Sequence, residues 1–387
     1  MSSIDFLLND DQRAMRQAAR DFAQKEIAPL AEKMDREEEI DRGMLKKLGE
    51  LGYLGMSIPP EYGGSYADFV TSTLISMEIG RACPGTTTTL GASSGLFGGN
   101  LANNGTSEQK QRYLPRIVTG EWIGCMGLTE PGAGSDAFSI RTRAEKRGDR
   151  YILNGTKTFI SNAPIADVAL IYALLEPDKG RKGIATFIVE KDFPGYTAGK
   201  KFEKMGLRAS PTGEIILEDC EVPEQNLVGM EPGKGFGQMI RGLNTERVGW
   251  SAIAVGLAKA AWIASFEYAQ QREQFGMPIF QFQMIQDKIA TMATEVHLGE
   301  LSCVCTAKMY DEDHDIALTG AQCKLFCTDM VMRVTTEAVQ VFGGYGYMRE
   351  FPVERYMRDA KVFAIGAGTN EVQKLLISHQ LMVKGID

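Results

Sequence analysis

Residues 128–136 have the sequence Leu128-Thr129-Glu130-Pro131-Gly132-Ala133-Gly134-Ser135-Asp136. This stretch closes what we expect to be the first strand of a β-rich block. Its two glycines, its proline and its small side chains predict a tight loop with exposed backbone N–H groups. Such a loop can bring main-chain donors to a flavin ring or a phosphate. Taken alone, however, the stretch is more typical of a plain turn.

The hydrophobic period changes on both sides of this loop, and the change divides the chain into three expected domains. Residues 1–122 and residues 229–387 show helical patterns, whereas residues 123–228 contain several β-prone runs. The block order is therefore α–β–α, which predicts an α+β fold in which a small β domain separates two helical ones.

Several helices and strands can be placed from local signals. Asn9 or Asp10 can cap a first helix, and Thr106 with Gln109 forms a capping box. Asn154-Gly155 lies between two β-prone runs and predicts a tight hairpin, because both central positions of such a turn need positive φ. Further strands are expected over 168–175, 184–189 and 214–222, and long amphipathic helices over 235–271, 283–310 and 315–342.

Composition bounds the function. The 387 residues carry 42 Lys+Arg and 50 Asp+Glu, a formal net charge of −8. This acidic balance argues against nucleic-acid binding, which needs a basic surface. Only three histidines are present, so histidine-based metal sites and triads are disfavoured. No secretory signal is expected at the N-terminus, and apolar stretches such as 252–258 fall short of the ~20 residues of a membrane span.

The seven cysteines are scattered and odd in number, which is typical of reduced thiols in a cytoplasmic protein. Cys323 and Cys327 lie one helical turn apart, but no second ligand pair is near them in the sequence. We therefore expect these thiols to pack in a core, and no metal site is predicted.

Four further motifs carry possible chemistry, each with a simpler interpretation. Phe159-Ile160-Ser161 could stack on a ring and hydrogen-bond its edge, or merely end a strand. Arg272 and Gln283 flank a Gly/Pro loop and could hold a pyrophosphate, or form an ordinary helix connection. Gly343, Gly344 and Gly346 follow a helix, where a C-cap needs only one glycine. Residues 365–372 open the last helix, either as an anion or ring site or as a simple N-cap.

In this order the motifs resemble the acyl-CoA dehydrogenase family, over essentially the whole chain. The resemblance rests on three stretches: residues 129–136, residues 340–346, and Arg358-Asp359-Ala360-Lys361 leading to Gly368-Thr369. It implies an N-terminal helical domain, a middle β-barrel and a C-terminal four-helix bundle. It also implies FAD as cofactor, an acyl-CoA substrate, a homotetramer, and electron-transferring flavoprotein as redox partner.

The resemblance also assigns roles to matching positions. The strand and loop from Met126 to Ser135 would face the flavin ring, and Ser135 would also face the thioester. Phe159, Ile160 and Ser161 resemble an aromatic-Ile-Thr flavin contact in which Ser replaces Thr. The remaining expected cofactor contacts are Leu128, Thr129, Gly134, Thr369 and Glu371 in the same chain, and Arg272, Phe275, Gln283, Gln340, Gly343 and Gly344 toward the FAD of a neighbouring subunit. Asn244, Arg247, Ala367 and Gly368 would contact the substrate.

The catalytic base is the most informative position. The reaction needs a carboxylate near the substrate's α-carbon. Many family members carry a Glu directly before the Gly-Thr near the C-terminus, where this chain has Ala367. A second subset, which includes isovaleryl-CoA and long-chain dehydrogenases, carries it on the helix after the middle domain, where this chain has Glu246. We therefore predict Glu246 as the base, with its pKa raised toward neutrality by burial. Without the resemblance, Glu246 would be interpreted as a surface carboxylate paired with Arg247 or Arg241.

The stretch Gly91–Asn100 corresponds to part of the family's acyl pocket. It is rich in small residues and has no charged side chain, which favours a short, branched or alicyclic acyl group over a dicarboxylyl one. Three alternatives remain open: an enoyl-CoA reductase that works in the reverse direction, an inactive flavin-binding scaffold, and a related oxidase or monooxygenase.

Overall fold

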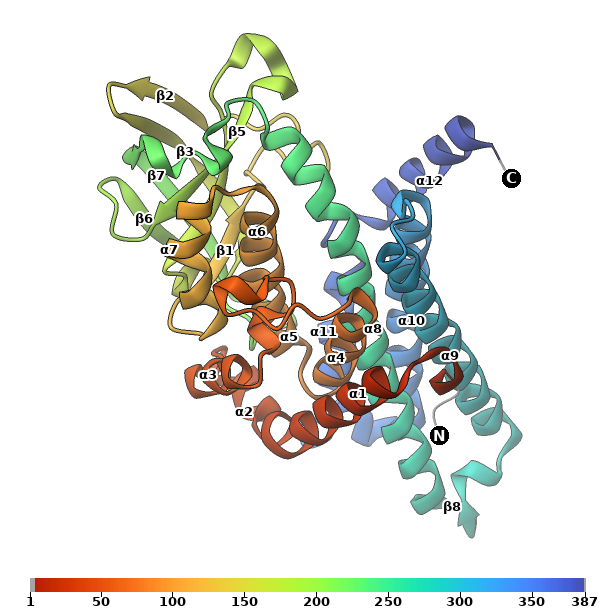
Figure 1. Ribbon diagram of the computed structural model, residues 1–387. Helices are drawn as coiled ribbons and strands as arrows, with labels where there is room; N and C mark the ends of the chain where they lie inside the picture. Colours follow the sequence, from red (N-terminus) through yellow and green to blue (C-terminus); the bar gives the residue numbers. More distant parts are fainter. Residues whose placement is uncertain (1–3, 386–387) are drawn as a thin grey trace.

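A computed structural model describes residues 4–385, and the chain order α–β–α is visible in it as three regions (Figure 1). The first region is helical. Asn9 caps its first long helix, accepting from the Gln12 N–H at 2.8 Å, and Thr106 and Gln109 form the expected capping box. The helices are α1 Asp10–Phe22, α2 Ala31–Glu37, α3 Arg42–Glu50, α4 Phe69–Ala82, α5 Pro84–Leu90, α6 Asn100–Asn104 and α7 Ser107–Val118, with π-helical turns at Ala23–Ile27 and Gly91–Gly99.

The middle region is a curled seven-stranded sheet, which corresponds to the predicted β-barrel. The hydrogen-bonded order is β1-β4-β2-β3-β7-β6, and β5 pairs with β4. Apolar side chains of β3, β4, β5 and β7 form the core of this sheet. The strands are β1 Gly124–Gly127, β2 Arg143–Arg147, β3 Arg150–Ser161, β4 Val168–Leu174, β5 Ile184–Glu190, β6 Tyr196–Lys201 and β7 Thr212–Pro223.

The predicted hairpin at Asn154-Gly155 is wrong. Both residues lie inside the continuous strand β3, which pairs along its length with β7, and the chain reverses instead between Arg147 and Arg150. Gly155 lies at a bulge with φ +152°, where a Cβ would approach the Thr142 Oγ1 to 2.5 Å. The local turn signal was overridden by sheet pairing, because a glycine is also required where another backbone comes this close.

The third region is a bundle of long helices, and its bounds match the amphipathic pattern closely. The elements are α8 Gly235–Gln271, α9 Gln283–Asp311, α10 Ala317–Phe342, α11 Val353–Ala360 and α12 Asn370–Lys384, with the short strands β8 Glu273–Gln274 and β9 Met277–Pro278 between α8 and α9. α8 packs against α4, α9 and α10. By length and composition alone α8 is apolar enough to cross a membrane, but 67% of its most apolar window is buried inside the protein.

A buried ion network ties the two helical regions together. The Arg16 guanidinium on α1 donates to Glu78 on α4 and to Glu300 on α9, each at 2.9 Å. Lys259 on α8 donates to the same Glu300 carboxylate at 2.6 Å. Because Lys259 lies near the middle of α8, the network holds this part of the helix against both helical regions.

Candidate active site

The loop after β1 is held from behind by a buried ion pair. The Lys157 ammonium on β3 donates to the Glu130 carboxylate at 2.7 Å and to the Leu128 carbonyl at 3.1 Å. Glu130 also accepts from the backbone N–H groups of Arg141 and Thr142. Burial lowers the pKa of Lys157 to about 8, against the attraction of Glu130. These contacts fix the loop of residues 128–136 between β1 and β3.

The predicted loop residues lie on the outer side of this anchor. Thr129 is half-buried and its carbonyl accepts from the Thr158 N–H at 2.9 Å, whereas Gly134 and Ser135 are exposed. A Cβ added at Gly134 would meet no other described heavy atom within 4 Å. Met126 and Leu128 belong to the apolar cluster beneath the loop. The loop therefore exposes its backbone and small side chains to solvent, so that a flat ring could lie against them.

The end of β3 carries the second predicted contact. Phe159 has φ +57° at a bulge, and its side chain is 68% exposed. Ile160 points into the sheet core, and Ser161 is half-buried at the end of the strand. Positive φ in a bulky residue is unusual and is concentrated at functional positions. An exposed aromatic held in this conformation is suited to contact a bound ring system.

Glu246 lies on α8, half-buried. Burial raises the pKa of its carboxyl to about 7, and the nearby charges of Arg247 and Lys324 partly oppose this shift. A carboxyl with this pKa is divided between its two protonation states near neutral pH, as a general base should be. The structure thus agrees with the pKa expected for this residue.

The loop before α12 lies against the same part of α8. Trp250, one turn after Glu246, donates its indole N–H to the Phe363 carbonyl at 3.0 Å, and a Cβ at Gly366 would lie 2.9 Å from its ring. Ala367 has φ +54°, and the Gln373 amide donates to its carbonyl at 3.3 Å. Because residues four apart share a helix face, Glu246 lies on the face of α8 that packs against this loop. Gly368, with φ +79°, belongs to the same loop.

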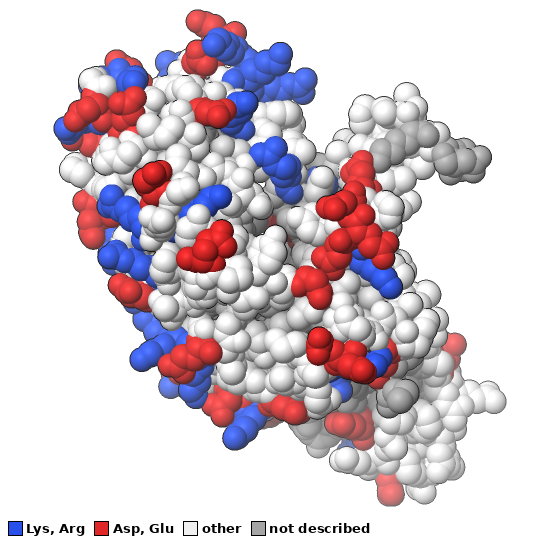
Figure 2. Space-filling model, in the orientation of Figure 1, with Lys and Arg blue, Asp and Glu red and all other residues white. Residues whose placement is uncertain are grey.

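Arg247 and Asn244 form a polar pair beside Glu246. The Arg247 Nη1 donates to the Asn244 Oδ1 at 2.7 Å, and burial lowers the pKa of Arg247. Its buried Nε has no hydrogen-bond partner among the described residues. A buried donor without a partner is costly, so this nitrogen is available to an anionic or carbonyl ligand. On the face drawn in Figure 2, Lys and Arg are interspersed with Asp and Glu over the sheet region.

The remaining predicted residues fall into two places. Thr369 and Glu371 lie at the start of α12, where the Thr369 hydroxyl accepts from the Val372 N–H at 3.3 Å as an N-cap. At the other end of the bundle, Arg272 lies over the Tyr345 ring, and Phe275 is 91% exposed with φ +53°. The exposed residues Gln283, Gln340, Gly343 and Gly344 belong to this second cluster.

One helix separates the two clusters. Arg272, the residue directly after α8, follows Glu246 by 26 positions along this continuous helix, which corresponds to about 39 Å at 1.5 Å per residue. Both clusters therefore cannot contact one cofactor within a single chain. This separation fits the expectation that Arg272 and its neighbours face the FAD of another subunit.

Sequence reasoning missed three residues that shape the site. Lys157, Lys324 and Trp250 were not singled out, although Lys157 and Lys324 are completely buried. A lysine on the inward position of an apolar pattern is an available signal, since buried lysines need a partner. For Lys324 that partner is the Asn370 side chain at 2.8 Å, at the first residue of α12.

The residues present fit FAD. Open space lies over Gly134, Gly343 and Gly344, so a ring or a pyrophosphate can approach the backbone. The exposed Phe159 and the half-buried Ser161 offer a stacking surface and a hydroxyl beside the first of these loops.

Comparison with known proteins identifies the family. Models of the acyl-CoA dehydrogenase N-terminal, middle and C-terminal domains match residues 9–121, 125–220 and 233–382. Isovaleryl-CoA dehydrogenase of Pongo abelii is 41% identical, with 96% of this chain and 89% of the relative covered. Acryloyl-CoA reductase (NADH) of Anaerotignum propionicum is 40% identical, with 99% and 97% covered.

A solved structure agrees at the level of the fold. A chain from a study of the electron transferring flavoprotein of Acidaminococcus fermentans and flavin-based electron bifurcation has a TM-score of 0.95 and 41% identity, with 97% of this chain and 98% of that chain covered. Since three family models together span almost the whole chain and the relatives match it nearly end to end, the chain belongs to the acyl-CoA dehydrogenase family, whose members are FAD-dependent oxidoreductases.

Proposed function

We propose that this enzyme introduces an α,β double bond into a short, branched or alicyclic acyl-CoA, with Glu246 as the base. The observation that carries this proposal is the half-buried Glu246 carboxyl, whose pKa burial raises to about 7, beside the loop of Ala367. Ala367 has no group that can accept a proton. Glu246 is therefore the carboxyl that this arrangement offers to a substrate α-carbon.

Different residues of the chain serve the proton transfer, the cofactor and the substrate. Glu246 removes the α-proton and holds it on its carboxyl. The positive charges of Arg247 and Lys324 limit how far burial raises the pKa of this carboxyl. FAD, when bound, supplies the hydride acceptor for the β-carbon. The loop from Met126 to Ser135, with Phe159, Ile160, Ser161, Thr369 and Glu371, would orient the cofactor, and Asn244, Arg247, Ala367 and Gly368 would orient the thioester.

The acyl preference rests on the segment Gly91–Asn100. Its π-helical turn buries the small residues Ser93 and Ser94, and the Ser93 hydroxyl accepts from the Gly124 N–H at 2.9 Å. A Cβ at Gly91 or Gly95 would meet no other described heavy atom within 4 Å. Small side chains leave width for a branched or cyclic group, and the segment has no cation to pair a distal carboxylate.

The proposed assembly is a cytoplasmic homotetramer that passes electrons to electron-transferring flavoprotein. The separation of about 39 Å along α8 supports an assembly of more than one chain. In that assembly a neighbouring subunit's flavin would be contacted by Arg272, Phe275, Gln283, Gln340, Gly343 and Gly344. The redox partner is supported by the similar solved chain, which comes from a study of the electron transferring flavoprotein of Acidaminococcus fermentans.

The test compares two carboxamide variants on one helix. Glu246→Gln should retain FAD but lose about 10²–10⁴-fold in anaerobic flavin bleaching by acyl-CoA, the usual contribution of a general base. Glu267→Gln, at an exposed position of the same helix, should leave the rate unchanged. Full activity of Glu246→Gln would refute the assignment. A clear preference for glutaryl-CoA or a C16 chain would refute the acyl preference.

An enoyl-CoA reductase is the second candidate, because acryloyl-CoA reductase is among the relatives at 40% identity. The same residues serve both directions. Reduction potentials of the substrate-bound enzyme, measured against those of the acyl/enoyl couple, separate the two candidates. An inactive scaffold would show no flavin bleaching with any acyl-CoA.

A further inference from the structure

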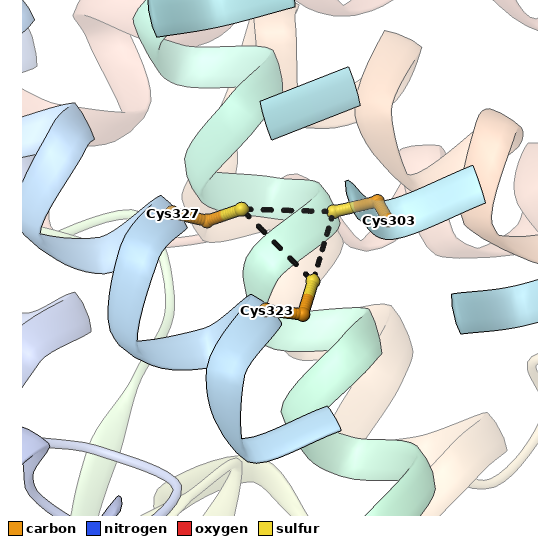
Figure 3. A group of neighbouring side chains, drawn as sticks. All are labelled: Cys303, Cys323 and Cys327. Carbon is orange, nitrogen blue, oxygen red and sulfur yellow. Dashed lines mark hydrogen bonds between the residues drawn. The ribbon is translucent and has the colours of Figure 1, made fainter. Parts of the chain in front are cut away.

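Three cysteines from two helices meet in the core of the C-terminal bundle (Figure 3). Cys303 lies on α9, and Cys323 and Cys327 lie one turn apart on α10. Their sulfur atoms are separated by 3.6 Å (303–323), 3.9 Å (303–327) and 4.0 Å (323–327). All three side chains are completely buried. Sequence spacing placed no further ligand near Cys323 and Cys327, and the packing of α9 on α10 supplies one.

The triangle has the size of a three-sulfur coordination site. An ion equidistant from three sulfurs at these separations would lie about 2.2 Å from each, close to the ~2.3 Å of a zinc–thiolate bond. The side chains therefore need almost no rearrangement to bind. We propose that Cys303, Cys323 and Cys327 form a three-coordinate site for a soft thiophilic cation, with Cu(I) as its best-matched occupant.

The number and type of ligands favour Cu(I) over Zn(II). The site offers three sulfur ligands, and no fourth His, Cys, Asp or Glu ligand joins them among the described residues. Structural zinc sites are almost always four-coordinate, whereas soft thiolates select Cu(I). The Gly299 carbonyl oxygen lies 3.9 Å from the Cys327 sulfur, which is too far for a bond to an ion at the centre of the triangle.

Binding releases protons, because thiolates and not thiols are the strong ligands. Two thiolates and one neutral thiol around Cu(I) release two protons and leave a net charge of −1.

The bundle must open for an ion to enter, so loading should be slow in the folded enzyme and fast during folding. The experiment uses the full-length FAD-bound enzyme, both from copper-supplemented growth and after long anaerobic incubation with Cu(I) acetonitrile complex. We expect one copper per chain by elemental analysis. X-ray absorption should show three sulfur neighbours at about 2.2 Å. Zn(II) in the same protocol should bind more weakly.

Variants locate the metal. Cys303→Ala should abolish copper binding with FAD content unchanged. Cys305→Ala is the matched control, since Cys305 is exposed on the same helix, and it should bind copper like the parent. The proposal is overturned if the parent enzyme contains no copper after either loading route. It is also overturned if Cys303→Ala still binds copper, or if copper is lost only in Cys305→Ala. If Cys303→Ala fails to fold, the absorption spectrum of the parent enzyme still decides, because fewer than three sulfur neighbours refutes the site.

Discussion

Removal of the Lys157 ammonium is predicted to destabilise the enzyme and to loosen its flavin loop. The side chain of Lys157 is fully buried and that of Glu130 is 7% exposed, and the pair lies directly behind residues 128–136. Lys157→Met keeps a similar volume but leaves the Glu130 carboxylate buried without its cation. Breaking a buried ion pair on one side costs about 3–5 kcal/mol. Glu130 keeps its hydrogen bonds from Thr142 and Arg141, so we expect the lower end, about 3 kcal/mol.

The assay is denaturant unfolding of the FAD-bound enzyme, followed by circular dichroism and by the release of flavin fluorescence. FAD affinity should also fall, because the Leu128 carbonyl loses its donor. Lys146→Met is the matched control on the neighbouring strand β2, since its pair with Glu224 is about half exposed and a solvent-screened pair contributes little to stability.

A double-variant cycle isolates the pair. Glu130→Gln removes the buried carboxylate that Lys157→Met leaves without a cation. Adding Glu130→Gln to Lys157→Met should therefore recover about 2 kcal/mol of the free energy of unfolding. The reasoning is refuted if Lys157→Met is no more destabilised than Lys146→Met, or if the second change gives no recovery.

Three further predictions concern the base. The kcat/KM of the parent enzyme should rise with pH to a plateau above about 7, because Glu246 must be ionised to accept a proton. Lys324→Met should move that rise to higher pH by removing a nearby cation, and an unchanged profile would contradict the electrostatic role of Lys324. In the Glu246→Ala background, adding Ala367→Glu should restore part of the activity, because the loop of Ala367 packs against α8 at Trp250, one turn after Glu246. Activity no higher than that of Glu246→Ala alone would show that the two positions do not reach the same substrate atom.

The fold was predicted largely from local signals. The caps at Asn9 and Thr106 and the bounds of α8, α9 and α10 followed from side-chain chemistry within one or two helical turns. The strands β4, β5 and β7 followed from β-prone runs. The failure at Asn154-Gly155 has the opposite cause, since the partners of β3 lie some sixty positions away on β7. A turn propensity of two residues cannot outweigh a continuous ladder of backbone hydrogen bonds.

The sequence by itself determined the order of the three domains and the family, and it predicted Glu246 as the base because Ala367 cannot accept a proton. These depend on residue identity and short spacing. Only the tertiary structure decided how Glu246 meets the Ala367 loop, how the ammonium of Lys157 is paired, and that Cys303 joins Cys323 and Cys327. These depend on contacts between distant segments, and the burial that shifts the pKa of Glu246 exists only when the helices and the sheet have packed together.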